Sequence, residues 1–374
     1  MLIVAALSFA TTTQAVGPET EAANTAVAYM RTLQNADGGF PGFGEESSPG
    51  TTLDAVFALV AAGVDPLDVT TDGNSPADYL AANADTYSAD AGGAAKLMLG
   101  VVLMGLDYTD FGGTNGGLDL PSVLEGHLAE DPATGVYGLD LFDQAFYLLA
   151  LTAAGEPIRP AAVDYLASLQ LDDGGWEFGP EFGSDTNTSA MAVQALLAAG
   201  VSPDDAVVER AVEYLHSAQH DSGGFGFLAG LEPDAQSTAF VIQALVAASE
   251  EIGPGGPWER VATPLAALLS FQNSETGAFQ FEGVDSPFAT FQSVPGLMLA
   301  PFPDLESRIV EEPIATSTPR SRPTEVEATS TPAPLVLPPA GGGPSDTVTW
   351  WPVALLIVAG AGAAGAAVLA RRPR

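Results

Sequence analysis

The chain has 374 residues, of which 47% are hydrophobic and 16% are charged, so it is long and apolar enough to bury a sizeable core. Its 47 acidic residues against 11 basic ones argue against binding to the phosphates of nucleic acids. The absence of cysteine excludes disulfides, thiolate zinc ligands and cysteine nucleophiles.

The N-terminal segment predicts export. Leu2–Ala10 is a short apolar run, and small and polar residues follow it as far as Ala15. This pattern is typical of the apolar region and cleavage site of a secretory signal, although the positively charged region before it is missing. We expect residues 1–15 to be a signal peptide that is truncated at its start.

A phrase of glutamine, three residues, two glycines and an aromatic residue recurs along the chain, with a looser fourth copy. Each copy follows an amphipathic helical segment and precedes an alanine-rich one, and we expect its glycines to break the helix. Repetition of this kind indicates a repeat architecture. Its fixed positions are Gln34, Gly39, Phe40, Gln170, Gly175, Trp176, Gln219, Gly224, Phe225, Gln272 and Phe279.

Helical periodicity predicts six helix pairs, each with an amphipathic helix followed by one that is apolar nearly all round. The second helices would form an inner layer and the first helices an outer one. We therefore expect an all-α toroid of six pairs over residues 20–303, with an open solenoid as the alternative. The pairs are 21–34 with 51–62, 76–82 with 94–105, 120–129 with 142–154, 161–170 with 189–199, 211–219 with 238–248, and 264–272 with 289–299.

The C-terminal region predicts a membrane anchor. Residues 304–346 are rich in Pro, Ser and Thr and predict a disordered stalk. Within it, Leu337–Gly341 resembles a cell-wall sorting signal of the LPxTG type, with Ala340 in place of threonine; a plain spacer is the alternative. Residues 347–370 predict one transmembrane helix, and the arginine-rich residues 371–374 a cytoplasmic tail.

The repeated phrase resembles the QW repeat of squalene cyclases, and the segments 185–196 and 234–245 are similar to inner-helix starts of the squalene cyclase/prenyltransferase-like superfamily. The resemblance implies an α6/α6 toroid. The cyclase acid motif Asp-x-Asp-Asp is matched only by Asp185-Thr186-Asn187-Thr188, so that Asn187 stands at the acid position. The zinc ligands of protein prenyltransferases, the thioester motif of complement-like proteins and the second domain of corrinoid carriers are missing.

Candidate site residues cluster at the starts of the predicted inner helices. Asp54, Asp143, Asp185 and Asp234 form either a carboxylate ring at one mouth, suited to cations, or helix caps. Phe178, Phe182, Phe227 and Phe281 follow the turns and either line a cavity mouth or pack in the core. We expect no metal site and no cofactor; the acidic loop 172–185 is only a weak match to a Ca²⁺ site.

These features together predict an exported, single-pass membrane protein whose toroid faces outward as a non-catalytic binding or surface-interaction module. Its expected partners are the lipid bilayer, through the C-terminal helix, and an unidentified small molecule or surface partner. The alternatives are a terpene-cyclase-like enzyme acting on an isoprenoid, with Asp185 as its best acid, or a corrinoid-binding or carbohydrate-active toroid.

Overall fold

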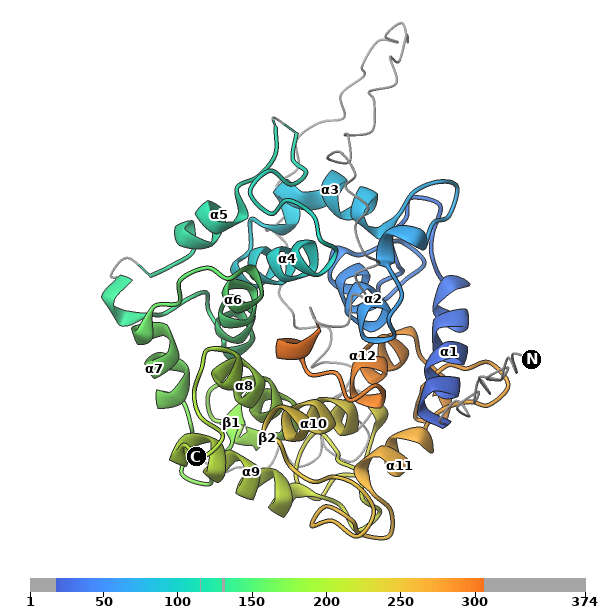
Figure 1. Cartoon of the computed structure of the whole chain (residues 1–374), viewed down its shortest axis with the longest axis vertical. Coiled ribbons are helices and arrows are strands. Elements are labelled where there is room, and N and C mark those ends of the chain that lie inside the picture. The colour runs from blue at the N-terminus through green and yellow to red at the C-terminus, as the bar shows by residue number, and fades with distance from the viewer. Residues whose placement is uncertain (1–17, 115, 130–131, 306–374) are drawn as a thin grey trace, which may run out of the picture. The chain divides into compact units, whose positions relative to one another are not determined.

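The computed structural model describes residues 18–114, 116–129 and 132–305, and in this part of the chain twelve α-helices alternate between an outer and an inner layer (Figure 1). The outer helices are α1 (Pro18–Arg31), α3 (Pro76–Tyr87), α5 (Leu120–Gly126), α7 (Pro160–Ser168), α9 (Ala206–Ala218) and α11 (Pro264–Leu269). The inner helices are α2 (Pro49–Ala61), α4 (Ala91–Leu103), α6 (Leu141–Ala154), α8 (Thr186–Ala198), α10 (Ala235–Ala247) and α12 (Pro287–Leu297).

The two layers follow from the two hydrophobic patterns. Every residue of α4 except Val102 is buried, whereas α9 buries one stripe that runs from Val208 to Ala218. A helix that is apolar all round must be enclosed by others, and an amphipathic helix covers it from outside. The predicted six pairs are therefore confirmed, with mostly helical structure and an inner and an outer ring.

The ring closes between its first and last repeats, which excludes the open solenoid. α12 packs against α1 and α2. The Gln272 Nε2 donates a hydrogen bond of 2.8 Å to the carbonyl of Ala22, 250 residues away in sequence. The last repeat therefore contacts the first through helix packing and through a hydrogen bond from a side chain to the backbone.

The repeated phrase holds neighbouring repeats together. Each glutamine donates both to its own turn and to the next repeat, as Gln170 does to the carbonyls of Gly174 at 2.9 Å and Val207 at 2.8 Å. Each aromatic side chain is fully buried, and its backbone N–H donates to a hydroxyl of the following inner helix, as Trp176 does to Ser189 at 2.9 Å. The glutamine and the aromatic residue of the phrase thus connect each outer turn to its neighbours.

Short elements complete the fold. Two hairpins pair β1 (Trp176–Glu177) with β2 (Ser184–Asp185) and β3 (Gln280–Phe281) with β4 (Val284–Asp285). The 3₁₀ turns are η1 (Pro66–Asp68), η2 (Pro132–Thr134) and η3 (Phe302–Asp304). η3 lies at the centre of the ring, so the packed domain runs through Leu305, beyond the predicted start of the stalk (Figure 1).

The predicted export and membrane segments lie almost entirely outside the residues that the structure describes. Among residues 18–114, 116–129 and 132–305, no helix combines the length and the hydropathy needed to cross a bilayer. The predicted signal (1–15), transmembrane helix (347–370) and tail (371–374), and all but the first two residues of the predicted stalk, lie outside the described residues. The signal peptide, the stalk, the transmembrane helix and the tail therefore stay predictions.

Candidate functional site in the lumen

The inner helices present three layers of side chains to the lumen, since the second, sixth and ninth residues of each helix lie on one face. The second residues are Gly50, Gly92, Phe142, Asn187, Gln236 and Phe288. The sixth residues are Asp54, Lys96, Phe146, Met191, Phe240 and Gln292. The ninth residues are Phe57, Leu99, Leu149, Gln194, Gln243 and Pro295.

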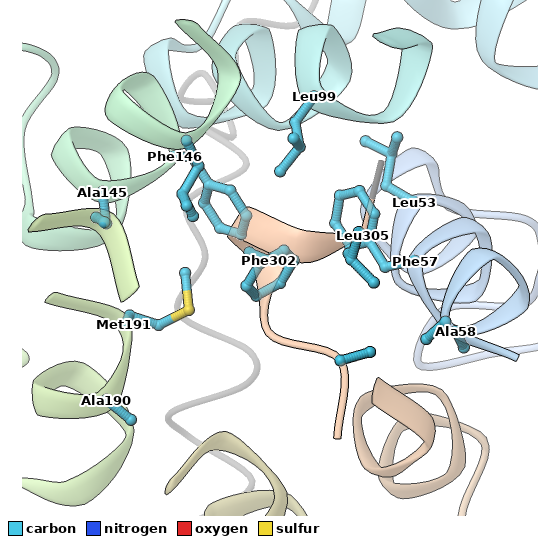
Figure 2. Close-up of a cluster of buried hydrophobic side chains, with 14 of the residues drawn as sticks. Leu53, Phe57, Ala58, Leu99, Ala145, Phe146, Ala190, Met191, Phe302 and Leu305 are labelled. Atoms are coloured by element: carbon cyan, nitrogen blue, oxygen red, sulfur yellow. The ribbon is translucent and has the colours of Figure 1, made fainter. Parts of the chain in front are cut away.

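The centre of the lumen is apolar and filled. Figure 2 shows Phe302 and Leu305, from the chain that follows α12, among side chains of α2, α4, α6 and α8. The Phe302 ring meets Phe57 and Phe146 edge to face, with centroids 5.3 and 5.9 Å apart, and Leu305 is fully buried. The domain's own chain therefore occupies the position where a ligand of a hollow toroid would lie.

A polar chain crosses four inner helices at the level of the sixth residues. Lys96 of α4 donates to Asp54 of α2 at 2.5 Å and to the carbonyl of Gly50 at 3.1 Å. Gln292 of α12 donates a long bond of 3.4 Å to the other Asp54 oxygen and accepts one of 2.6 Å from Gln236 of α10. Because these residues lie in the first two turns of their helices, the four N-termini share one end of the lumen.

Lys96 is the only lysine of the chain, and it is 1% exposed. Burial lowers the pKa of its ammonium group, and the neighbouring Asp54 carboxylate opposes that shift. The ammonium also lies 5.8 and 5.7 Å from the ring centroids of Phe57 and Phe146, within the range of a cation–π interaction. The lumen thus holds one cation whose charge is already compensated.

Asp185 and Asp234 occupy equivalent positions as N-caps of α8 and α10. Asp185 accepts a hydrogen bond from the Thr188 N–H at 2.8 Å, and Asp234 accepts one from the Ser237 N–H at 2.8 Å. Capping explains why these helices begin three residues before the predicted starts. The capping interpretation therefore describes both carboxylates.

The second carboxylate oxygens of these two caps differ. The Ser237 hydroxyl donates to Oδ2 of Asp234 at 2.7 Å. Oδ2 of Asp185 and the hydroxyl of Thr188 are both buried, and neither makes a hydrogen bond of good geometry to a described residue, although the Thr188 hydroxyl and the Phe178 N–H lie close enough to the carboxyl group to oppose the rise of its pKa. Burial raises the pKa of Asp185 to about 7, so that a large part of this carboxyl group is protonated at neutral pH.

The other two carboxylates of the predicted ring do not cap. Asp143 lies in the first turn of α6, where Asp140 is the cap, and its Oδ2 accepts from the Leu139 N–H at 2.8 Å. Burial and the neighbouring Asp140 raise the pKa of Asp143 to about 7. Asp54 is the partner of Lys96. The four carboxylates share one end of the toroid, but each is engaged in a different local contact.

The predicted aromatic residues form pairs between neighbouring repeats. Phe178, which follows β1, meets Phe142 of α6 at 6.2 Å, and Phe182 meets Phe227 at 5.8 Å, both edge to face. Phe182 is 41% exposed and Phe227 is 5% exposed, whereas Phe281 lies half-buried in β3. Phe182 lies three residues before the Asp185 cap and Phe178 seven residues before it.

Sequence reasoning missed the residues that distinguish the lumen. Lys96, Gln236 and Gln292 form the polar chain, and a lone lysine within an apolar helix was the available signal. Gln194 and Gln243 also face inward, one in each of two equivalent helices. Phe302 could not be found in this way, because it lies after the last repeat.

Comparison with known proteins supports the toroid fold. Residues 145–239 match the family model of the squalene-hopene cyclase N-terminal domain. Residues 2–97 match that of the prenyltransferase alpha-alpha toroid domain, a match that includes the predicted signal segment. A search of the curated proteins gave no match.

Several solved structures share the toroid. The type II terpene cyclase MstE from Scytonema is 15% identical, with a TM-score of 0.54 over 75% of this chain and 97% of that one. A variant of it bound to geranylgeranyl dihydroxybenzoate, its substrate, is 17% identical with the same TM-score and coverage. A protein from Actinoplanes is 15% identical, with a TM-score of 0.54 over 75% of this chain and 99% of that one.

The expectation of a non-catalytic binding or surface-interaction module is wrong. It relied on Asn187 at the acid position of the cyclase motif and on the presence of a single toroid, yet the matched region covers 96–97% of the MstE structures. Several neighbours that share the fold are type II terpene cyclases, one with its substrate and one with its product bound, so the fold gives no support to a non-catalytic module. Two family models thus match separate parts of the chain, each less than half of it, and the twelve-helix toroid resembles squalene cyclase- and prenyltransferase-like proteins in its fold.

Proposed function

We propose that the protein is a terpene-cyclase-like enzyme that cyclises a linear isoprenoid in the lumen, with Asp185 as the proton donor. The observation that carries the proposal is the state of this carboxyl group. It is fully buried, its pKa is raised to about 7, and one oxygen has no hydrogen-bond partner among the described residues. A carboxyl group held neutral near physiological pH is the form that a general acid needs.

Asp185 caps α8 at the end of the lumen where the inner helices begin, and Asn187, two residues on, is the lumen-facing residue of α8 at that level. Asp185 begins α8, and Met191 of the same helix faces the centre of the ring (Figure 2). The two residues are separated by about 9 Å along the helix axis. An extended chain that runs along the lumen would therefore pass from the central apolar layer toward the Asp185 end.

The chemistry is an isomerisation that needs no oxidant or reductant. The Asp185 O–H bond breaks as its proton forms a C–H bond with a terminal alkene carbon, which leaves a carbocation on the neighbouring carbon. The next alkene attacks that carbon and forms the ring bond, and loss of a proton ends the reaction. The faces of Phe142 and Phe178 would stabilise positive charge near this end of the lumen.

The test compares Asp185→Asn with Asp234→Asn. Asparagine caps helices about as well as aspartate, so both variants should keep the fold. Asp234 is the matched control because both of its oxygens are hydrogen-bonded. Purified proteins are incubated with squalene and geranylgeraniol, and products are resolved by gas chromatography with mass spectrometry, since a cyclised isomer has the mass of its substrate.

We expect the wild type and Asp234→Asn to form a cyclised product and Asp185→Asn to lose activity by about a hundredfold or more. Equal turnover by the two variants would show that Asp185 is not the acid. A complete lack of product from every protein and both substrates would overturn the enzyme proposal.

A further inference from the structure

The segment after α12 turns inward and fills the lumen. Phe302 is 7% exposed and lies between rings of α2 and α6, and its N–H donates to Oε1 of Gln194 at 3.0 Å. Pro301 and Pro303 flank it. Because proline has no backbone N–H, these two residues need no hydrogen-bond acceptor inside the apolar lumen. The site is thus occupied by an apolar side chain on a short, irregular stretch of chain.

The lumen offers a second acceptor at the same depth that this segment does not use. Gln243 has the position on α10 that Gln194 has on α8, nine residues after the cap in each case. Both amide nitrogens are directed to their own helices, at 3.4 Å from the carbonyls of Ala190 and Ala239. Oε1 of Gln243 is buried and has no hydrogen-bond partner among the described residues. A ligand that replaced Phe302 would meet two carbonyl acceptors and would need to bring a donor.

The charge of the lumen restricts the ligand further. The basic residues of the described part of the chain are Arg31, Lys96, Arg159, Arg210 and Arg260. The four arginines lie on outer helices or the loops that lead to them, and Lys96 is already paired with Asp54. Asp143, Asp185 and Asp234 lie at the entrance formed by the inner-helix starts. A diphosphate would therefore enter without a compensating cation.

We propose that the level of the lumen now filled by Phe302 and Leu305 binds the chain of an uncharged isoprenoid that carries a hydroxyl group, and that residues 300–305 leave the lumen when it binds. The hydroxyl donates to Gln194 or Gln243. The hydrocarbon then extends toward Asp185, which lies about 13 Å away along the axis of α8. This inference rests on the proposed function for its substrate class. It adds the hydroxyl head group of the ligand and the role of residues 300–305, which compete with the ligand for the lumen.

The experiment uses the full chain and follows the segment directly. In Phe302→Trp, the new indole reports its surroundings by fluorescence, and geranylgeraniol is the probe. Saturable binding should shift the emission to longer wavelength as the indole moves from the apolar lumen into water. Geranylgeranyl diphosphate should cause no shift, and the methyl ether of geranylgeraniol should bind about tenfold more weakly because it lacks the donor.

A second pair of variants separates competition from stability. Phe302→Ala weakens the competitor, so geranylgeraniol should bind about tenfold or more tightly by calorimetry, because the open state is more populated. Phe291→Ala is the control: Phe291 is fully buried on α12 and packs against Phe40 of the first repeat. It should lower the melting temperature without a change in affinity.

Binding without an emission shift in Phe302→Trp would overturn the inference, as would unchanged or weaker binding by Phe302→Ala. Equal affinity for the diphosphate would refute the charge argument. Binding with the expected exchange but no cyclised product would refute the proposed function alone. Cyclisation without exchange would refute this inference alone.

Discussion

The glycine turns set the spacing between repeats, and Gly174→Ala tests this role. Gly174 has a φ of +92°, and a Cβ atom placed on it would lie 2.3 Å from the carbonyl oxygen of Arg210 in α9. The same contact recurs around the ring. The Cβ would lie 2.2 Å from the Ser75 carbonyl oxygen at Gly38, 2.1 Å from that of Ala262 at Gly223, and 2.3 Å from that of Thr25 at Gly277.

The expected cost has two parts. A left-handed conformation costs an alanine about 1–2 kcal/mol. Pushing apart two packed backbones adds about 1–3 kcal/mol, because the obstacle is a carbonyl group rather than a flexible side chain. The free energy of unfolding should therefore fall by about 2–5 kcal/mol in Gly174→Ala.

The matched control is Gly200→Ala. Gly200 has nearly the same φ, +91°, but a Cβ there meets no atom within 4 Å. It should lose about 1–2 kcal/mol, the strain alone. Urea denaturation of both variants, with equal m-values, measures the difference. Equal losses in the two proteins would show that the contact with α9 does not set the repeat spacing.

Three further predictions concern charge and location. Asp143 and Asp185 each have a pKa raised from 3.8 to about 7, so the folded protein binds more protons than the unfolded chain between these values. Unfolding at several pH values should show stability falling as pH rises from about 4 to 7, by up to about 4 kcal/mol for each group, with a shallower slope in Asp185→Asn. Asp54→Ala should destabilise by about 3–5 kcal/mol in urea, because it leaves the buried Lys96 unpaired, while Asp54→Leu with Lys96→Met should recover most of that loss. Protease added to intact cells should release a fragment that ends within residues 313–345, and protection until lysis would refute the predicted topology.

Much of the fold could be predicted because the same helix-pair pattern occurs several times in the sequence. The alternation of amphipathic and apolar helices predicted both layers, and Gln170 with Trp176 indicated where one repeat meets the next. The turn itself was predicted less well. Only Gly174 of the glycine pair has a positive φ; Gly175 is required because a Cβ would lie 2.6 Å from that of Ser184. A steric contact across the β1–β2 hairpin does not require an unusual backbone conformation at Gly175.

The candidate site was harder to predict because it lies where the repeats differ. Asp185 and Asp234 have the same local sequence role, and only the partner of the second oxygen separates them, since Ser237 donates to its cap and Thr188 does not. Such a difference concerns the orientation of one hydroxyl group, which the hydrophobic periodicity of the sequence cannot predict.

The same principle explains the other unusual residues of the lumen. Lys96 lies in the second repeat, which keeps the helix pair but loses the glutamine phrase, and there the inner helix gains a charge. Phe302 lies after the sixth repeat, where no repeat pattern constrains the chain. Equivalent positions of the repeats make the same packing contacts between inner and outer helices, and this restricts the residues that they can carry. Positions that depart from the pattern without disrupting that packing are the ones available for chemistry, and Lys96 and Phe302, which both lie against Phe57 and Phe146 in the lumen, are such positions.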